Sequence, residues 1–475
     1  MFAEMSTRTR HILDRIDHPV IDSDGHTLEF LPRIRDVLRE VAGEQLISGF
    51  DAVMNPRPLY DSLSDEERRR NGMFRMTWWG FPAENTLDRA TALLPRLQYE
   101  RMEELGIDYA VLYPTVGLAC LGLEEADLRQ GMTRAFNTDT ARSFRDYADR
   151  LTHVALIPMH TPEEAIAELD HAVLELGAKA VVMSGFVFRP LPGTGLPRAA
   201  RWVDTFDGDS PYDYDPVWAR CVELGISPTF HSSSMGWYRA SSLTNYIYNH
   251  VGNFSSASET TCRSLFLHGV PRRFPELQFA FLEGGVGWAC SLYADMISHW
   301  EKRNRNAIRS YDPKRIDRAR VRELFSLYAD TPTKRHIDEI EESLQLLADP
   351  DEDPAGLDEF AQSGVESAQD IATIFSGQFH FGCEADDPLN GLAFQRQMNP
   401  LDTRLSIVIG SDIGHWDVPD TREVLGEAWE LVERGLLDET AFRAFVFDNP
   451  VNLWTRTNPR FFEGTVLEKR IPRAS

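Results

Sequence analysis

Short apolar runs that alternate with helical stretches constrain the fold of this chain more than any other feature. The runs are rich in β-branched and aromatic residues and cover residues 19–24, 109–114, 153–158, 178–183, 225–231, 277–283, 379–383 and 405–412. They are almost continuously apolar, which is typical of strands that are buried on both faces of a parallel sheet. We therefore predict eight parallel strands.

Helical segments separate these predicted strands. Residues 161–177 show the pattern most clearly, because Thr161 is a suitable N-cap, Pro162 occupies the first helical position and Gly177 ends the helix. Repeated alternation of strand and helix is typical of a (β/α)8 TIM barrel. An open, doubly wound sheet is the alternative, and the number of predicted strands favours the closed barrel.

Two long stretches exceed what a minimal barrel requires. Residues 30–105 follow the first predicted strand and contain the aromatic sequence MFRMTWWGF, whereas residues 300–375 follow the sixth and are polar, helical and acidic. Connections of this length are uncommon in compact domains unless they carry structure of their own. We predict a single α/β domain over residues 1–475, a distorted barrel with helical insertions after strands 1 and 6.

Composition excludes several classes of protein. The formal net charge is −25 and the isoelectric point is about 4.9. Such an acidic chain lacks the basic face that nucleic acids require, and it is repelled by anionic membrane surfaces. Charges interrupt the N-terminal segment, and no apolar run has the length of a membrane-spanning helix. We expect a cytoplasmic protein that acts on a small molecule.

The cysteines are few and far apart, with no C-x-x-C pair: Cys120, Cys221, Cys262, Cys290 and Cys383. This spacing matches neither a disulfide framework nor a zinc ribbon. We interpret them as small apolar residues of the core.

Polar residues end several of the predicted strands, where a TIM barrel carries its active site. Asp24 and His26 are two residues apart at the end of the first strand, so both point to the same face of an extended chain. His231 ends the fifth strand and Asp412 the eighth. Two carboxylates and two imidazoles suit Zn²⁺ or Mn²⁺. Each residue alone is more often structural, but their shared position favours a metal site.

The same segments resemble the amidohydrolase-related proteins, the branch of the amidohydrolase superfamily that includes aminocarboxymuconate-semialdehyde decarboxylase. DSDGH at 22–26 resembles the first motif of the branch, and GSDIGHWD at 410–417 resembles its signature on the eighth strand. Residues 265–288 resemble its approach to strand six, and residues 448–465 its C-terminal helix and tail.

This resemblance implies a distorted barrel with one divalent metal ion, held by Asp24, His26, His231 and Asp412. Zn²⁺ is the first expectation. Much of the superfamily has H-x-H on strand one, and the acidic first ligand here shifts the preference toward Mn²⁺.

Three residues are candidates for catalysis. Asp412 is both a metal ligand and a candidate base. Glu283 stands at the end of strand six, where the decarboxylases of the branch carry a histidine, and would act as a general base or proton shuttle. A structural carboxylate that receives backbone N–H groups is an equally open interpretation. His415 would support the metal ligands or bind substrate; alternatively, it holds its loop in place.

Four further residues are candidates for substrate contact: His250, Arg57, Trp79 and Glu384. His250 follows strand five in a segment that we expect to fold over the barrel mouth. Arg57 would bind a substrate carboxylate, and Trp79 would cap the pocket. The alternatives are a solvated arginine, a tryptophan packed within the insertion and, for Glu384, a salt bridge.

The sequence leaves three functions open. The first is a metal-dependent hydrolase that acts on an amide or an activated carbon–carbon bond of a small cyclic or aromatic acid. The second is a metal-dependent, non-oxidative decarboxylase of an aromatic or muconate-like acid. The third is a non-catalytic barrel used for binding. Members of the branch are commonly dimers, so we expect a homodimer.

Overall fold

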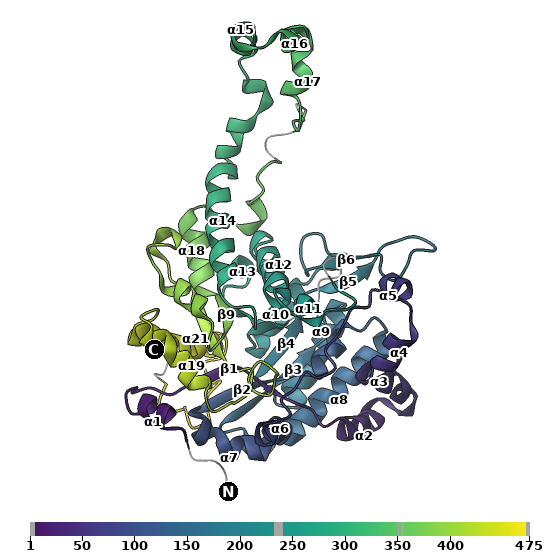
Figure 1. Ribbon diagram of the computed structural model, residues 1–475, viewed down its shortest axis with the longest axis vertical. Coiled ribbons are helices and arrows are strands. Elements are labelled where there is room, and N and C mark those ends of the chain that lie inside the picture. Colours follow the sequence, from purple (N-terminus) through teal and green to yellow (C-terminus); the bar gives the residue numbers. More distant parts are fainter. Residues whose placement is uncertain (1–4, 232–240, 350, 353–355, 472–475) are drawn as a thin grey trace.

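The computed structural model describes residues 5–231, 241–349, 351–352 and 356–471 (Figure 1). Eight strands form one parallel sheet, in the order β1 (Ile21–Thr27), β2 (Tyr109–Pro114), β3 (Leu151–Ile157), β4 (Ala180–Ser184), β7 (Pro228–His231), β8 (Phe279–Phe281), β9 (Phe379–Glu384) and β10 (Ser406–Gly410). All eight coincide with predicted strands, with bounds that differ by a few residues. The first strand begins two residues and ends three residues later than predicted, and the fifth, sixth and eighth are shorter than predicted.

The two end strands of this sheet lie side by side, which nearly closes the barrel. The Asp412 N–H donates to the Asp24 carbonyl at 3.1 Å, and the Ser411 N–H donates to the Asp22 carboxylate at 3.1 Å. The prediction of a distorted (β/α)8 barrel is therefore confirmed, and the open doubly wound sheet was the wrong alternative.

The barrel core is filled by the strands themselves. β1, β2, β4 and β10 are buried at every position, as expected for strands covered on both faces. Phenylalanines extend this packing across neighbouring strands: the ring centroids of Phe230 and Phe281 are 5.6 Å apart, and those of Phe281 and Phe381 are 6.1 Å apart.

Helices follow most strands and cover the outside of the barrel. They comprise α1 (Thr7–Leu13), α8 (Ala126–Phe144), α9 (Pro162–Asp170), α10 (Asp215–Leu224), α12 (Asn253–Leu267), α13 (Val270–Arg273), α18 (Ala368–Gly377), α19 (Val424–Glu433), α20 (Glu439–Arg443) and α21 (Asn449–Thr455). The Thr161 side chain accepts a hydrogen bond from the Glu164 N–H at the start of α9, so this predicted N-cap is present. An antiparallel hairpin, β5 (Val187–Pro190) and β6 (Arg201–Asp204), follows β4 and was not predicted from the sequence.

Six helices lie between β1 and β2: α2 (Leu31–Ala42), α3 (Ile47–Met54), α4 (Arg57–Ser62), α5 (Asp65–Asn71), α6 (Thr86–Leu93) and α7 (Pro95–Leu105). Buried Arg101 joins α7 to α6 through Asp88 at 2.7 Å, and it also pairs with Glu104 at 2.9 Å. Asp88 in turn accepts the Thr421 N–H at 2.8 Å. This network fastens the helices after β1 to the loop that follows β10.

The segment between β8 and β9 leaves the barrel as a long arm, with α14 (Gly287–Arg303) at its base and α15 (Arg318–Tyr328), α16 (Thr331–Lys334) and α17 (Ile340–Leu344) at its tip (Figure 1). The prediction that this insertion is acidic holds only for its second half. Residues 302–335 contain eleven Lys and Arg against four Asp and Glu, whereas residues 338–359 contain only acidic charges. Arg318 and Glu341 join the two halves at 3.0 Å.

None of the helices in the described part of the chain combines the length and the apolarity that crossing a membrane requires.

Candidate metal centre

Asp24 and His26 enter the barrel mouth through an irregularity in β1. The register with β2 shifts between Asp22 and Gly25. A Cβ atom on Gly25 would lie 2.4 Å from the Asp22 carboxylate and 2.9 Å from Leu112, so only glycine fits there. Asp22 accepts hydrogen bonds from the Asp24 N–H at 3.2 Å and the Ser411 hydroxyl at 2.5 Å, which ties β1 to the residue after β10.

His231 and Glu283 form the second part of the centre. His231 is the last residue of β7, and Glu283 lies two residues beyond β8 with a φ of +56°. The His231 Nε2 and Glu283 Oε2 atoms are 2.6 Å apart, and both side chains are buried. Burial raises the pKa of Glu283, but the nearby imidazoles, His231 foremost, bring it below its usual value.

Asp412 and His415 form the third part. Asp412 has a φ of +46°, and its Oδ1 lies 2.5 Å from the His415 Nδ1. Burial raises the pKa of the Asp412 carboxyl well above its usual value, and the negative charges of Glu283 and Glu384 raise it further. Glu283 and Asp412 therefore both have a left-handed backbone, which is strained for residues other than glycine. Residues with such strain are concentrated at functional sites.

These parts meet at His26 and make two overlapping sets of metal-ligating atoms. Asp24, His26 and His231 form one set, and His26, Glu283, Asp412 and His415 form the other, with the atoms of each set within 4.8 Å of one another. The His26 Nε2 lies 3.7 Å from the Asp24 Oδ1 and 3.5 Å from the Asp412 Oδ1.

The donor atoms of the centre fit a divalent cation. Across the described residues, the buried Asp24 Oδ1 and His26 Nε2 have no hydrogen-bond partner. Burying a carboxylate oxygen without a partner is costly, and a cation would remove that cost. Imidazole nitrogens and carboxylate oxygens are ligands of both Zn²⁺ and Mn²⁺.

The structure therefore brings the four sequence-predicted ligands to one place, but in two sets. Asp412 belongs to the set without Asp24 and His231, and Glu283 and His415 join it there. Glu384, the last residue of β9, lies close enough that burial and the charges of Glu283 and Asp417 raise its pKa well above the usual value.

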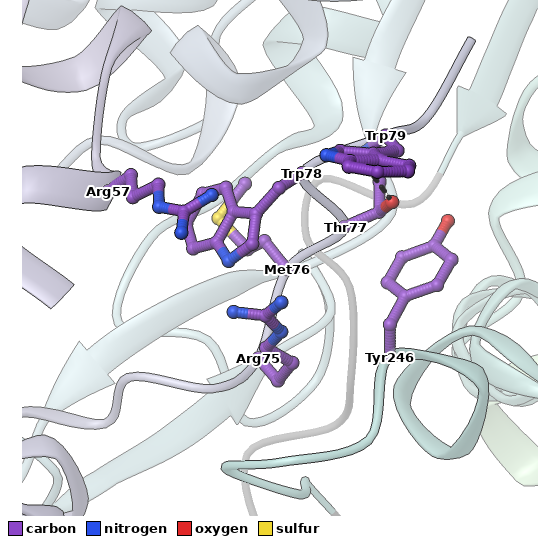
Figure 2. Close-up of a pocket in the computed structure, with 7 residues that line it drawn as sticks. All are labelled: Arg57, Arg75, Met76, Thr77, Trp78, Trp79 and Tyr246. Carbon is purple, nitrogen blue, oxygen red and sulfur yellow. Dashed lines mark hydrogen bonds between the residues drawn. The ribbon is translucent and has the colours of Figure 1, made fainter. Parts of the chain in front are cut away.

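The other candidates for substrate contact lie around the mouth. His250 ends α11 (Tyr246–His250), and its ring centroid is 5.5 Å from those of Trp416 and Phe254. Arg57 is half exposed and pairs with Asp61 at 3.2 Å. Trp79 is 89% exposed. Both Arg57 and Trp79 line a hollow on the first insertion, together with Tyr246 (Figure 2).

Two residues of the centre escaped the sequence analysis. The Thr115 hydroxyl lies 3.3 Å from the His26 Nδ1 and 3.1 Å from the His415 Nε2, so it connects the two imidazoles. Asp417 raises the pKa of Asp412. Both had a signal: Thr115 directly follows the second strand, and Asp417 ends the GSDIGHWD motif.

Comparison with known proteins identifies relatives of the whole fold. The amidohydrolase family model matches residues 21–330. No curated protein sequence matches the chain.

Solved structures extend the similarity to the rest of the chain. A dihydroxybenzoic acid decarboxylase from a Polaromonas species, with bound manganese and an inhibitor, is 14% identical, with a TM-score of 0.51 over 92% of this chain and 97% of that chain. A 5-carboxyvanillate decarboxylase from Novosphingobium aromaticivorans, also with bound manganese, is 12% identical, with a TM-score of 0.50 over 96% of this chain and 100% of the other. At these identities the similarity establishes the shared fold.

Proposed function

Because the chain belongs to the amidohydrolase family, we propose that it is a metal-dependent enzyme that removes a carboxyl group from a small aromatic acid. The observation that carries the proposal is the pair of buried, unpartnered ligand atoms on Asp24 and His26, at the point where both ligand sets meet. The choice of reaction is supported by the two manganese-bound relatives with this fold, which are aromatic acid decarboxylases by name.

We propose a single divalent cation at Asp24, His26, His231 and Asp412, with Mn²⁺ ahead of Zn²⁺. The ligand atoms include several carboxylate oxygens, which suit Mn²⁺ better than a set dominated by nitrogen or sulfur would. A cation bound there would polarise an oxygen of the substrate.

The residues around that position handle the proton. Decarboxylation of an aromatic acid anion breaks the bond between ring and carboxyl carbons, releases CO₂ and places one proton on the ring carbon. The His415 Nδ1 lies 2.5 Å from the Asp412 Oδ1 at the mouth, and we propose that His415 delivers this proton to the ring carbon. Thr115 keeps His415 and His26 in place.

Hydrolysis is the second candidate, and Glu283 favours it. Its carboxylate lies 2.6 Å from His231 and within the second ligand set, a position suited to a base that takes a proton from water.

Isotope labelling separates the two reactions. The manganese-loaded protein is incubated with 2,6-dihydroxybenzoate and with 5-carboxyvanillate in D₂O, and with amide derivatives of aromatic acids in H₂¹⁸O. Decarboxylation releases CO₂ and places one solvent deuterium on the ring carbon. Hydrolysis instead places ¹⁸O in a product carboxylate and would overturn the decarboxylase assignment.

Metal analysis tests the centre itself. We expect about one manganese or zinc ion per chain, and its loss in H26A. H336A, which removes an exposed histidine on the arm, is the matched control and should keep its metal. A chain that binds neither metal would contradict the whole proposal.

We further propose a homodimer in the cytoplasm. The five cysteines are free thiols, which suits a reducing compartment. The arm supports self-association, because Leu327 and Tyr328 of α15 are 63% and 81% exposed and α15 has no buried residue.

A further inference from the structure

A hollow beside the metal centre is lined by aromatic and basic side chains that the proposed reaction does not use. It has a volume of about 390 Å³, and we call it the tryptophan pocket: Arg57, Arg75, Trp78, Trp79 and Tyr246. Figure 2 shows Arg57 and Arg75 approaching Trp78, with Tyr246 rising from α11 on the other side of the hollow.

The pocket offers hydrogen-bond donors that lack acceptors. The Arg75 guanidinium lies over the Trp78 ring at 5.1 Å and forms no ion pair with any described residue. The Trp78 indole N–H is buried and has no acceptor within the described part of the chain. Residues 232–240, whose placement is not described, contain no Asp or Glu. In a chain with a net charge of −25, an arginine without a carboxylate partner beside an unpaired N–H indicates an anion site.

A second cation strengthens this end of the pocket. Arg57 lies over the same Trp78 ring at 5.6 Å, and its partner Asp61 is half exposed to solvent. Exposed ion pairs of this kind are weak, so Arg57 is free to turn toward a bound anion.

Aromatic rings connect the pocket to the metal centre. The Tyr246 ring lies 5.4 Å from His250, His250 lies 5.5 Å from Phe254, and Phe254 lies 5.3 Å from the metal-centre residue His231. Trp416, next to His415, lies 6.4 Å from Tyr246. These contacts form a chain of rings from the wall of the pocket to His231, so an aromatic ligand bound between Arg75 and the metal centre would meet aromatic surface.

We infer that the tryptophan pocket is a second anion subsite, and that the substrate is an aromatic diacid with one carboxylate at the metal and another at Arg75 and Trp78. The inference rests on the proposed function for the end of the molecule that reacts at the metal.

Calorimetric titration of the manganese-loaded protein tests this without requiring turnover. The probes are matched pairs of increasing length: isophthalate with benzoate, and biphenyl-4,4′-dicarboxylate with biphenyl-4-carboxylate. We expect at least one diacid to bind about tenfold more tightly than its monoacid, the effect of roughly one charge-assisted contact. R75Q should abolish that preference. R69Q, which removes an exposed arginine of α5, should retain it.

W78F provides an independent variant, because it keeps an aromatic ring and removes the indole N–H; it should reduce the preference even if R75Q does not fold. The inference is overturned if no diacid is preferred by the wild type, or if R75Q and W78F keep the full preference. Metal content is measured on the same samples. Protein that binds metal without a diacid preference refutes the subsite alone, whereas protein without metal refutes the proposed function.

Discussion

Single residues decide whether the metal centre can form, and Gly25 is the clearest case. Its lack of a side chain leaves room for the Asp22 carboxylate, which binds both Ser411 and Asp24 and so keeps the proposed ligands on β1 and on the loop after β10 in register. Glu283 and Asp412 adopt left-handed backbone conformations at the same mouth.

Replacing Gly25 by alanine should therefore damage the centre. The added methyl group meets Asp22 and Leu112 at distances that require one of them to move, which costs about 1–3 kcal/mol of unfolding free energy. We expect a lower melting temperature together with less bound metal. G377A at the end of α18, where the nearest atom is 3.8 Å away, should change neither. Full metal content in G25A would contradict this role.

Glu29, just beyond β1, makes the stability of the folded protein depend on pH. Its carboxylate accepts the N–H groups of Val116 and Gly117 at 3.0 and 2.9 Å, but burial prevails and raises its pKa to about 7. The folded state therefore binds the proton more tightly than the unfolded state, whose pKa is near 4.5. The stability from this group is fully present below about pH 4.5 and is lost as the pH rises to about 7, by up to about 3 kcal/mol.

The E29Q variant should lack this dependence. Denaturant unfolding between pH 5 and 8, within the range where such groups titrate, should show the variant gaining stability relative to the wild type as the pH rises. Parallel curves for the two proteins would exclude Glu29 as the source. E44Q, on an exposed carboxylate that pairs with Arg39, should follow the wild type.

At the scale of elements, α6 and α7 illustrate how an insertion is attached to a barrel. Buried Arg101 neutralises Asp88 and Glu104, and Asp88 binds the loop after β10. Loss of the arginine would remove the ion-pair partner of two buried carboxylates.

We expect R101A to lower the unfolding free energy by about 3–5 kcal/mol, because breaking a buried ion pair leaves uncompensated charge. Chemical denaturation measures this effect. R96A removes the exposed partner of Glu100 on the same helix and should leave stability unchanged. Equal effects of the two variants would show that burial of the network contributes nothing.

At the scale of the whole molecule, the arm is the feature that a single barrel does not explain. Its basic half extends away from a strongly acidic chain, and its tip exposes Leu324, Leu327 and Tyr328 (Figure 1). A second copy of this chain offers the acidic surface that complements it, so we expect the dimer to form through the arm.

The variant L327D/Y328D should then run as a monomer in light scattering coupled to size-exclusion chromatography. L389D, at a half-exposed leucine of the barrel body, should remain dimeric. A wild-type monomer, or a double variant that stays dimeric, would refute this interface.

The fold and the residues at the mouth were predictable because their signals are local. Strand and helix periodicity reveals the barrel, and strand ends in a barrel share one face, so Asp24, His26, His231 and Asp412 were expected to meet. Thr115 satisfied the same rule and was overlooked, because threonine at a strand end carries no distinctive chemistry.

Other features required the tertiary structure. Glu283, Asp412 and His415 come within reach of one metal position because of loop conformations that include positive φ angles. The periodicity of the sequence does not encode such conformations. The pairing of Arg75 with Trp78, and their position opposite Tyr246, arises where two segments about 170 residues apart in sequence meet across the mouth. Local sequence determines elements and their order, whereas the course of long insertions is set by the contacts they find once the barrel has formed.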